Sequence, residues 1–180
     1  ADLCLDILEK TYPDAHCELE HESPFELLVA TILSAQCTDV RVNKVTSEMF
    51  KKYKEPEDFA DMDIKKLEGL IKECGLFRNK AKNIKASSSV ILEDYDGEVP
   101  NTISELMKLP GVGKKTANVV ASTAFGVPAI AVDTHVFRVS NRIGFVHEKN
   151  VLDTEKALQN KIDKSRWTKA HHLFIFQIGR

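Results

Sequence analysis

The sequence predicts an all-α fold of about ten helices. Apolar residues recur at helical spacing in one segment after another. Many of these segments begin at a Ser, Thr or Asp suited to an N-cap, and several end at a glycine. No stretch alternates apolar and polar residues as a half-buried strand would. The apolar run 127–132 includes Pro128 and has no partner strand, so we interpret it as a buried linker.

Composition places the chain among ordinary globular proteins, with 43% hydrophobic and 29% charged residues. Its 180 residues fit one domain or two small lobes. The formal net charge of −2 gives no support for nucleic-acid binding, which would need basic residues gathered on one face. Candidates for such a basic face are Arg78, Lys80, Lys82, Lys85 and Lys108, although solvated helix surfaces look the same.

No signal for a membrane or for secretion is present. No apolar run approaches the ~18 residues of a membrane span, and the first residues lack the pattern of a signal peptide. The four cysteines have no C-x-x-C spacing, and a chain with a good core does not need disulfides. We therefore expect reduced thiols and a cytoplasmic protein.

Helix-start signals recur along the first half of the chain. The segment 3–8 gives an amphipathic first helix that stops before Pro13. Ser23-Pro24-Phe25-Glu26 is a capping box with proline at the first helical position, and the nearly continuous apolar residues after it predict a helix buried on most sides. Asp39 and Asp63 are expected to cap two further helices, the second ending at Gly75, before a longer helix over 79–92.

The second half continues in the same way. Asp96-Gly97 marks a turn, and Thr102-Ile103-Ser104-Glu105 is a second capping box. The helix after residue 113 should end near Gly126. Asp133 then caps a helix that ends at Gly144, and two more helices follow near 153–162 and 165–177.

The segment Leu109-Pro110-Gly111-Val112-Gly113-Lys114-Lys115-Thr116-Ala117 joins two predicted helices by a tight turn. Pro110 ends the first helix, and the two glycines allow positive φ and close approach of the backbone. The first N–H groups of the second helix lack acceptors within that helix and attract anions, phosphate above all.

Lys114 and Lys115, at the start of the second helix, favour a role for this turn in binding a polyanion. Cations at a helix N-terminus oppose the helix dipole, at a cost of about 0.3–1 kcal/mol each. A purely structural helix start would more often carry Asp or Glu, whereas a polyanion lying over the turn would remove the penalty. The alternative is an ordinary loop with two accidental lysines.

The nonapeptide 109–117 resembles the helix-hairpin-helix of the DNA glycosylase superfamily, in the L-P-G-V-G-x-K-T-A form of the endonuclease III family. Ser23-Pro24-Phe25-Glu26-Leu27-Leu28, Leu33-Ser34-Ala35-Gln36 and Ala131-Val132-Asp133-Thr134-His135-Val136-Phe137-Arg138-Val139 resemble segments of the same family, so the resemblance runs from Ser23 to the last residue. It implies a two-lobed fold with the active site in the interlobe cleft. Residues 17–127 would form a six-helix lobe containing the hairpin, and residues 1–16 with 128–180 the second lobe.

Lys115 stands where the family has its Schiff-base nucleophile. An amine attacks carbon only when unprotonated, a form that the helix N-terminus, Lys114 and partial burial would favour. The alternative is a solvated lysine that contacts phosphate, which is the role we expect for Lys114. Asp133 matches the family's catalytic aspartate, which faces the lysine and helps expel the base. From the residues alone Asp133 is an ordinary N-cap, and the two roles are compatible.

The resemblance also implies DNA contacts. Chemistry on a base within a duplex requires extrusion of the nucleotide, and something must fill the gap. Gln36 and Leu76 match the family residues that fill it, although alone they would be a helix-end polar residue and a core leucine. The hairpin residues expected to bind DNA are Gly111, Val112, Gly113, Lys114 and Thr116.

We therefore expect a bifunctional DNA N-glycosylase of base excision repair. It would remove damaged, oxidised pyrimidines and nick the strand by β-elimination through a Schiff base on Lys115. Its partner would be double-stranded DNA with a damaged base or an abasic site. We expect a monomer without membrane association, located in the cytoplasm or, in a bacterium, on the nucleoid.

Two other classes compete with this hypothesis. One is a non-catalytic helix-hairpin-helix DNA-binding protein. The other is a metal-dependent nuclease, which the sequence disfavours because no His/Asp/Glu constellation has convincing ligand spacing. We assign no metal ligand. Adenine-specific relatives generally lack lysine at the position of Lys115, which argues against that specificity.

The resemblance raises one further expectation. Family members usually continue past Gly-Arg into four closely spaced cysteines that ligate a [4Fe–4S] cluster, whereas this sequence stops at Gly179-Arg180. Its own cysteines cannot substitute. We assign no cluster ligand here, and expect a cluster if a four-cysteine tail exists beyond Arg180. The end of the sequence directly after an apolar helix favours a missing tail.

Overall fold

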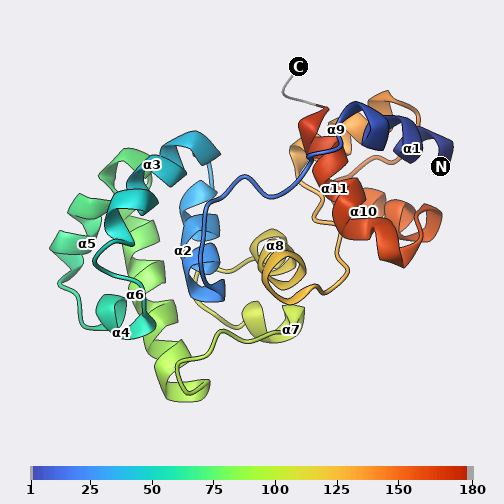
Figure 1. The fold of residues 1–180 in the computed structure, drawn as a ribbon. Helices are drawn as coiled ribbons and strands as arrows, with labels where there is room; N and C mark the ends of the chain where they lie inside the picture. Colours follow the sequence, from blue (N-terminus) through green and yellow to red (C-terminus); the bar gives the residue numbers. More distant parts are fainter. Residues whose placement is uncertain (1, 178–180) are drawn as a thin grey trace. The chain divides into compact units, whose positions relative to one another are not determined.

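The computed structural model describes residues 2–177 (Figure 1). In this part of the chain, eleven α-helices and two short 3-10 helices occur, and no strand. The predicted all-α fold is therefore confirmed. The chain divides into two compact units: Glu18–Phe125 is one, and the described residues of Ala1–Cys17 and Gly126–Arg180 form the other.

The unit Glu18–Phe125 is built around one buried helix. Its helices are α2 (Pro24–Ser34), α3 (Asp39–Met49), α4 (Pro56–Ala60), α5 (Ile64–Leu70), the 3-10 helix η1 (Lys72–Cys74), α6 (Phe77–Asp94), α7 (Ile103–Leu106) and α8 (Lys114–Phe125). Residues 25–33 of α2 are all buried, as the apolar run predicted. Helix α2 packs against α3, α6 and α8, so it supports the helices on which the candidate site lies.

Local signals set the start of α2. The Ser23 hydroxyl accepts the Glu26 N–H at 3.1 Å, which is the predicted cap. The Glu26 carboxylate accepts the N–H of Glu22 at 2.6 Å, one residue before the cap. Pro24 occupies the first turn, where its missing N–H costs nothing.

One prediction about this unit was wrong in detail, and one helix was not predicted. The N-cap of α3 is Thr38, whose hydroxyl accepts the Arg41 N–H, and Asp39 is the first helical residue. Helix α4 was not predicted, because five residues are too few to show an apolar period. The signals that start it are Pro56 in the first turn and a capping box of Glu55 with Asp58.

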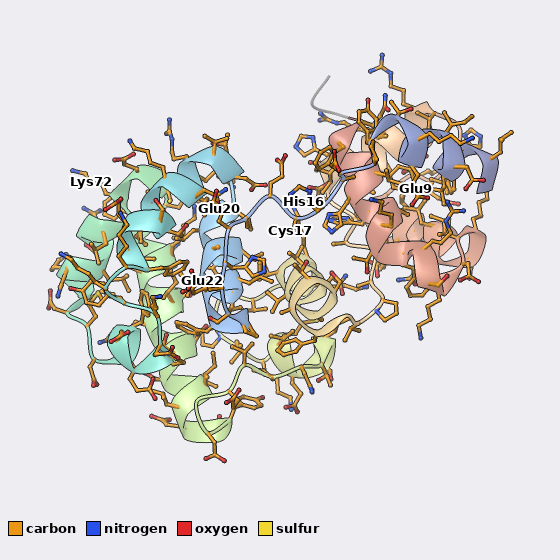
Figure 2. All side chains as sticks on the ribbon, in the orientation of Figure 1. Glu9, His16, Cys17, Glu20, Glu22 and Lys72 are labelled. Atoms are coloured by element: carbon orange, nitrogen blue, oxygen red, sulfur yellow. The ribbon has the colours of Figure 1, made fainter. Side chains whose placement is uncertain are left out.

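The other unit joins the two ends of the chain. Its helices are α1 (Asp2–Thr11), α9 (Thr134–Arg142), α10 (Val151–Lys161), the 3-10 helix η2 (Lys164–Arg166) and α11 (Trp167–Phe176). Their shared core includes Leu5, Ile130, Val136, Leu158 and Phe174. At its surface Arg166 pairs with the carboxylates of Asp6 and Glu9, at 2.7 and 3.2 Å (Figure 2 labels Glu9).

The apolar linker has no regular structure, as predicted. Helix α8 ends at Phe125, and Gly126 follows with a φ of +66°. Residues 129–132 are buried without forming a strand. Among residues 2–177, no helix is both long and apolar enough to cross a bilayer.

Candidate functional site

The turn between α7 and α8 has the hairpin geometry that its sequence predicted. After α7, the Leu109 N–H donates to the carbonyl of Leu106, and the Val112 N–H donates to that of Leu109, both at 3.1 Å. The Gly113 carbonyl then accepts the Ala117 N–H at 2.9 Å, which closes the first turn of α8. Three consecutive backbone turns therefore place the start of α8 directly after Gly113.

The two glycines of the turn have different roles. Gly111 has a φ of +77°, and a Cβ there would lie 2.6 Å from the Cβ and Nδ2 of Asn83 on α6. The Ser87 hydroxyl of the same helix donates to the Pro110 carbonyl at 2.6 Å. Gly113 has no positive φ, and nothing lies within 4 Å of its Cβ position. The expected need for positive φ and close approach therefore holds for Gly111 alone.

The remaining hairpin residues differ in exposure. Lys114 and Lys115 are the first two residues of α8, and both are exposed. The partial burial that we expected for Lys115 is therefore not observed. Thr116 is half-buried. Val112 is buried, and its N–H is used within the turn, so its side chain belongs to the core of the hairpin.

Asp39 is a residue near Lys115 that the sequence analysis treated only as a helix cap. Burial raises the pKa of its carboxyl group, the Glu18 carboxylate raises it further, and the charge of Lys115 lowers it. The Lys115 ammonium and the Asp39 carboxyl group are thus within electrostatic reach inside one unit. No signal in the sequence predicts this pairing, because residues far apart in the chain come near one another only when α3 and α8 both pack against α2.

Gln36 and Leu76 share an unusual backbone conformation. Gln36 follows α2 with a φ of 54°, and Leu76 precedes α6 with a φ of 45°. A bulky residue with positive φ is strained and persists only where the surrounding structure holds it. Both side chains are exposed, Leu76 by 58%. The alternative of a core leucine is therefore wrong for Leu76.

The expected basic face is smaller than predicted. Lys80 is buried and donates to two backbone carbonyls, and Lys85 donates to the carbonyls of Ala60 and Met62 at 2.6 and 2.7 Å. These two ammonium groups therefore face the protein. Arg78, Lys82 and Lys108 are exposed, and Lys108 pairs with Glu105 at 3.2 Å.

Asp133 is the N-cap of α9, as predicted. One carboxylate oxygen, Oδ1, accepts the N–H groups of His135 and Val136, both at 2.9 Å. The side chain is half-buried and follows the buried residues 129–132. Asp133 belongs to the unit that contains α9, whereas Lys115 belongs to Glu18–Phe125.

The described cysteines do not fit an iron–sulfur cluster. Cys4 and Cys17 lie in one unit, the latter in the loop after α1 (Figure 2), and Cys37 and Cys74 lie in the other. A [4Fe–4S] cluster needs four thiolates around it. Within residues 2–177, no three His, Cys, Asp or Glu side chains gather as a metal site. Gly179 and Arg180 lie outside the described residues.

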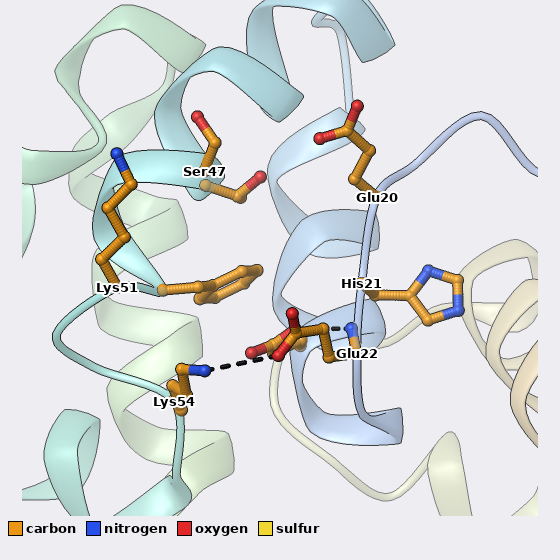
Figure 3. Close-up of a pocket in the computed structure, with 9 residues that line it drawn as sticks. Glu20, His21, Glu22, Ser47, Lys51 and Lys54 are labelled. Carbon is orange, nitrogen blue, oxygen red and sulfur yellow. Dashed lines mark hydrogen bonds and ion pairs between the residues drawn. The ribbon is translucent and has the colours of Figure 1, made fainter.

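One hollow in the unit Glu18–Phe125 is lined by no residue of the hairpin segment 109–117 (Figure 3). Its lining consists of Glu20, His21, Glu22, Glu26, Thr46, Ser47, Phe50, Lys51 and Lys54. Lys54 pairs with Glu22 across it at 3.3 Å, and Glu26 accepts the Glu22 N–H. None of the predicted site residues lines it, and we assign it no function.

Comparison with known proteins identifies similar chains. The family model described as "HhH-GPD superfamily base excision DNA repair protein" matches residues 29–164. The chain is 57% identical over 176 residues to endonuclease III of Bacillus subtilis (strain 168), covering 97% of this chain and 80% of the relative. It is 44% identical over 168 residues to endonuclease III of Escherichia coli (strain K12), covering 93% and 80%.

Solved structures agree with these relatives. A structure described as "Structure of a non-covalent Endonuclease III-DNA Complex" is 56% identical, with a TM-score of 0.94, over 97% of this chain and 82% of that one. A second, "Structure of a Trapped Endonuclease III-DNA Covalent Intermediate: Estranged-Adenine Complex", has the same identity and TM-score over 97% and 83%.

Proposed function

The chain belongs to the endonuclease III family of the HhH-GPD superfamily of base excision DNA repair proteins, and we propose that it removes damaged pyrimidines with Lys115 as the nucleophile. It is a DNA glycosylase and abasic-site lyase, and it binds DNA. The finer assignments to oxidised pyrimidines and to particular residues are our proposals.

The structure at the start of α8 is the main support for this proposal. A turn pinned to α6 through Gly111 and Pro110 leads into a helix whose first two residues are exposed lysines. Helix N-termini attract phosphate, and a DNA backbone would offset the cost of placing Lys114 and Lys115 there. We infer that Gly111, Gly113, Lys114 and Thr116 hold the DNA backbone at this turn, with Val112 as its buried support.

The proposed chemistry follows from an unprotonated amine. The Lys115 Nζ lone pair attacks the deoxyribose C1′, and the bond from C1′ to the base breaks with its electron pair leaving on the base. Opening of the sugar ring gives a Schiff base between C1′ and Nζ. Loss of a C2′ proton then expels the 3′ phosphate, which nicks the strand. At an abasic site the same amine condenses with the C1′ aldehyde and releases water.

We propose supporting roles for three further residues. Asp133 assists departure of the base, in addition to capping α9. Gln36 and Leu76 fill the gap that the extruded nucleotide leaves, and their exposed side chains at strained turns support this role. We also propose that residues 17–127, and residues 1–16 with 128–180, are the two lobes of the glycosylase fold.

Four other features remain proposals. The substrate is double-stranded DNA with a damaged base or an abasic site, and the enzyme acts as a monomer in the cytoplasm or, in a bacterium, on the nucleoid. A [4Fe–4S] cluster would need four thiolates from a tail beyond Arg180, because the cysteines at 4, 17, 37 and 74 do not gather. The proposed reaction of Lys115 does not use a cluster.

Strand cleavage in excess EDTA tests the reaction class. We expect nicking of a duplex with one abasic site to proceed unchanged when free divalent metal is removed, because an amine performs the chemistry. The measurement is the single-turnover nicking rate with and without EDTA. Loss of cleavage in EDTA would point to a metal-dependent nuclease, and no cleavage in either condition to a non-catalytic DNA-binding protein.

Alanine substitutions at the two hairpin glycines test DNA affinity and folding stability separately. Gly113→Ala is expected to leave the melting temperature nearly unchanged, because the added methyl meets nothing. It should weaken binding to any duplex by about fivefold, since the methyl enters the space over the turn where a phosphate would lie. Binding to an undamaged duplex at fixed salt, together with the melting temperature, measures both effects.

Gly111→Ala is the matched control for this prediction. Positive φ and the contact with Asn83 should cost about 2 kcal/mol of unfolding free energy, and lower the melting temperature by about 4–8 °C. A melting temperature equally reduced in Gly113→Ala, or unchanged DNA affinity in that variant, would contradict the assignment of the turn.

A further inference from the structure

Lys80 is a buried lysine that none of the proposed chemistry uses. It lies one turn into α6 and is only 4% exposed. Its Nζ donates to the carbonyl of Leu33 at 2.9 Å and to that of Cys74 at 2.7 Å. Ammonium groups are rarely buried unless such hydrogen bonds offset the loss of water. The carbonyls of Leu33 and Cys74 therefore need a buried donor, which Lys80 supplies.

Both acceptors lie at the ends of helical segments. Leu33 is in the last turn of α2, and Cys74 is the last residue of η1. Carbonyls at a helix C-terminus lack partners within the helix and carry partial negative charge, so a cation suits them. Burial lowers the pKa of Lys80, while the thiols of Cys37 and Cys74 oppose this effect. One ammonium group thus joins the ends of two separate segments.

A strained, exposed residue follows each acceptor within three positions of the chain. Gln36 follows Leu33 by three positions, and Leu76 follows Cys74 by two. Their φ values of 54° and 45° are unfavourable for side chains with a Cβ, so the neighbouring structure must hold both turns. The Lys80 ammonium group is hydrogen-bonded to the backbone three residues before Gln36 and two residues before Leu76.

We propose that Lys80 is a positioning residue, which ties the end of α2 to the end of η1 so that Gln36 and Leu76 enter the gap in the duplex together. This inference rests on the proposed function of those two residues. Lys80 is buried and its ammonium group faces two protein carbonyls, so its proposed role is to position other residues. Without it, the two turns would move independently, and binding that requires both would weaken, whereas contacts of the hairpin with the DNA backbone would not.

Lys85 offers a matched control on the same helix. Its Nζ also donates to two carbonyls, those of Ala60 and Met62, but at a place remote in the chain from both turns. Lys80→Met and Lys85→Met therefore each remove one lysine that bridges two carbonyls. The probes are a duplex with a tetrahydrofuran abasic-site analogue and the same duplex undamaged, bound at one salt concentration.

Lys80→Met should lower the preference for the abasic analogue by about tenfold to a hundredfold, with unchanged affinity for undamaged DNA. Lys85→Met should keep the preference, and Lys80→Arg, which retains charge and donors, should restore most of it. An equal loss in both Met variants would mean general destabilisation and would overturn the proposal. If Lys80→Met does not fold, Lys80→Gln, which keeps a donor for one carbonyl, is expected to give a smaller loss of preference, and no loss would overturn the proposal.

Gln36→Ala and Leu76→Ala separate this inference from the function on which it rests. Both variants should lose preference for the abasic analogue. If neither does, the gap-filling roles are wrong and the inference falls with them. If both do and Lys80→Met does not, the gap-filling roles stand and only the role of Lys80 is wrong.

Discussion

Replacing Lys115 by alanine is expected to reduce strand nicking at an abasic site by at least about 10³-fold. The amine is the atom that forms the covalent bond to C1′, and the alanine methyl offers no nucleophile. Borohydride reduces a Schiff base to a stable amine, so it should trap a covalent complex between the wild-type protein and abasic DNA. The same treatment of Lys115→Ala should yield none.

Lys114→Ala is the control that the structure provides. Lys114 precedes Lys115 on the first turn of α8, and both side chains are exposed. Removing the Lys114 charge should weaken DNA binding in a salt-dependent way, because a phosphate contact is lost. Trapping by borohydride should persist once the DNA concentration saturates the protein. A trapped complex of normal yield in Lys115→Ala would show that another amine is the nucleophile.

Replacing Asp133 by asparagine is expected to slow excision of a damaged base by about 10²–10⁴-fold, while the fold is retained. Asparagine caps a helix about as well as aspartate, and its amide oxygen can still accept the N–H groups of His135 and Val136. What the substitution removes is the negative charge. That charge should matter most while positive charge develops on the sugar as the base departs.

The measurement pairs two single-turnover rates in each protein: excision from a damaged duplex and nicking of an abasic duplex. The abasic site has already lost its base, so Asp133→Asn should impair nicking much less than excision. Asp163→Asn is a matched control, because Asp163 also caps a helix of the same unit and accepts the Ser165 N–H at 2.9 Å. Equal excision rates in wild type and Asp133→Asn would leave Asp133 as a helix cap alone.

Helix caps and turns that depend on a few consecutive residues were predicted correctly. The cap of α2 by Ser23, the cap of α9 by Asp133 and the end of α8 before Gly126 each depend on one side chain and the backbone beside it. The hairpin belongs to the same class, because proline and glycine act on their own torsion angles. Such local rules need no knowledge of the rest of the chain.

The cap of α3 shows where a local rule fails. Thr38 and Asp39 are adjacent and are both good N-cap residues, so their sequence does not decide between them. In the structure Thr38 caps the helix, and the charges of Glu18 and Lys115 act on the Asp39 carboxyl group in the first turn. Packing of separate segments made this choice.

By itself, then, the sequence determined an all-helical chain, the hairpin and the start of most helices, because each follows from contacts between near neighbours. The family resemblance of the segment 109–117 added the chemistry. Only the tertiary structure decided that Gly111 is pressed against Asn83 and that Lys80 is a buried tie between α2 and η1 instead of a surface charge. The contacts of Gly111 with Asn83 and of Lys80 with Leu33 join residues far apart in the chain, and such burial and hydrogen bonding exist only once the helices have packed.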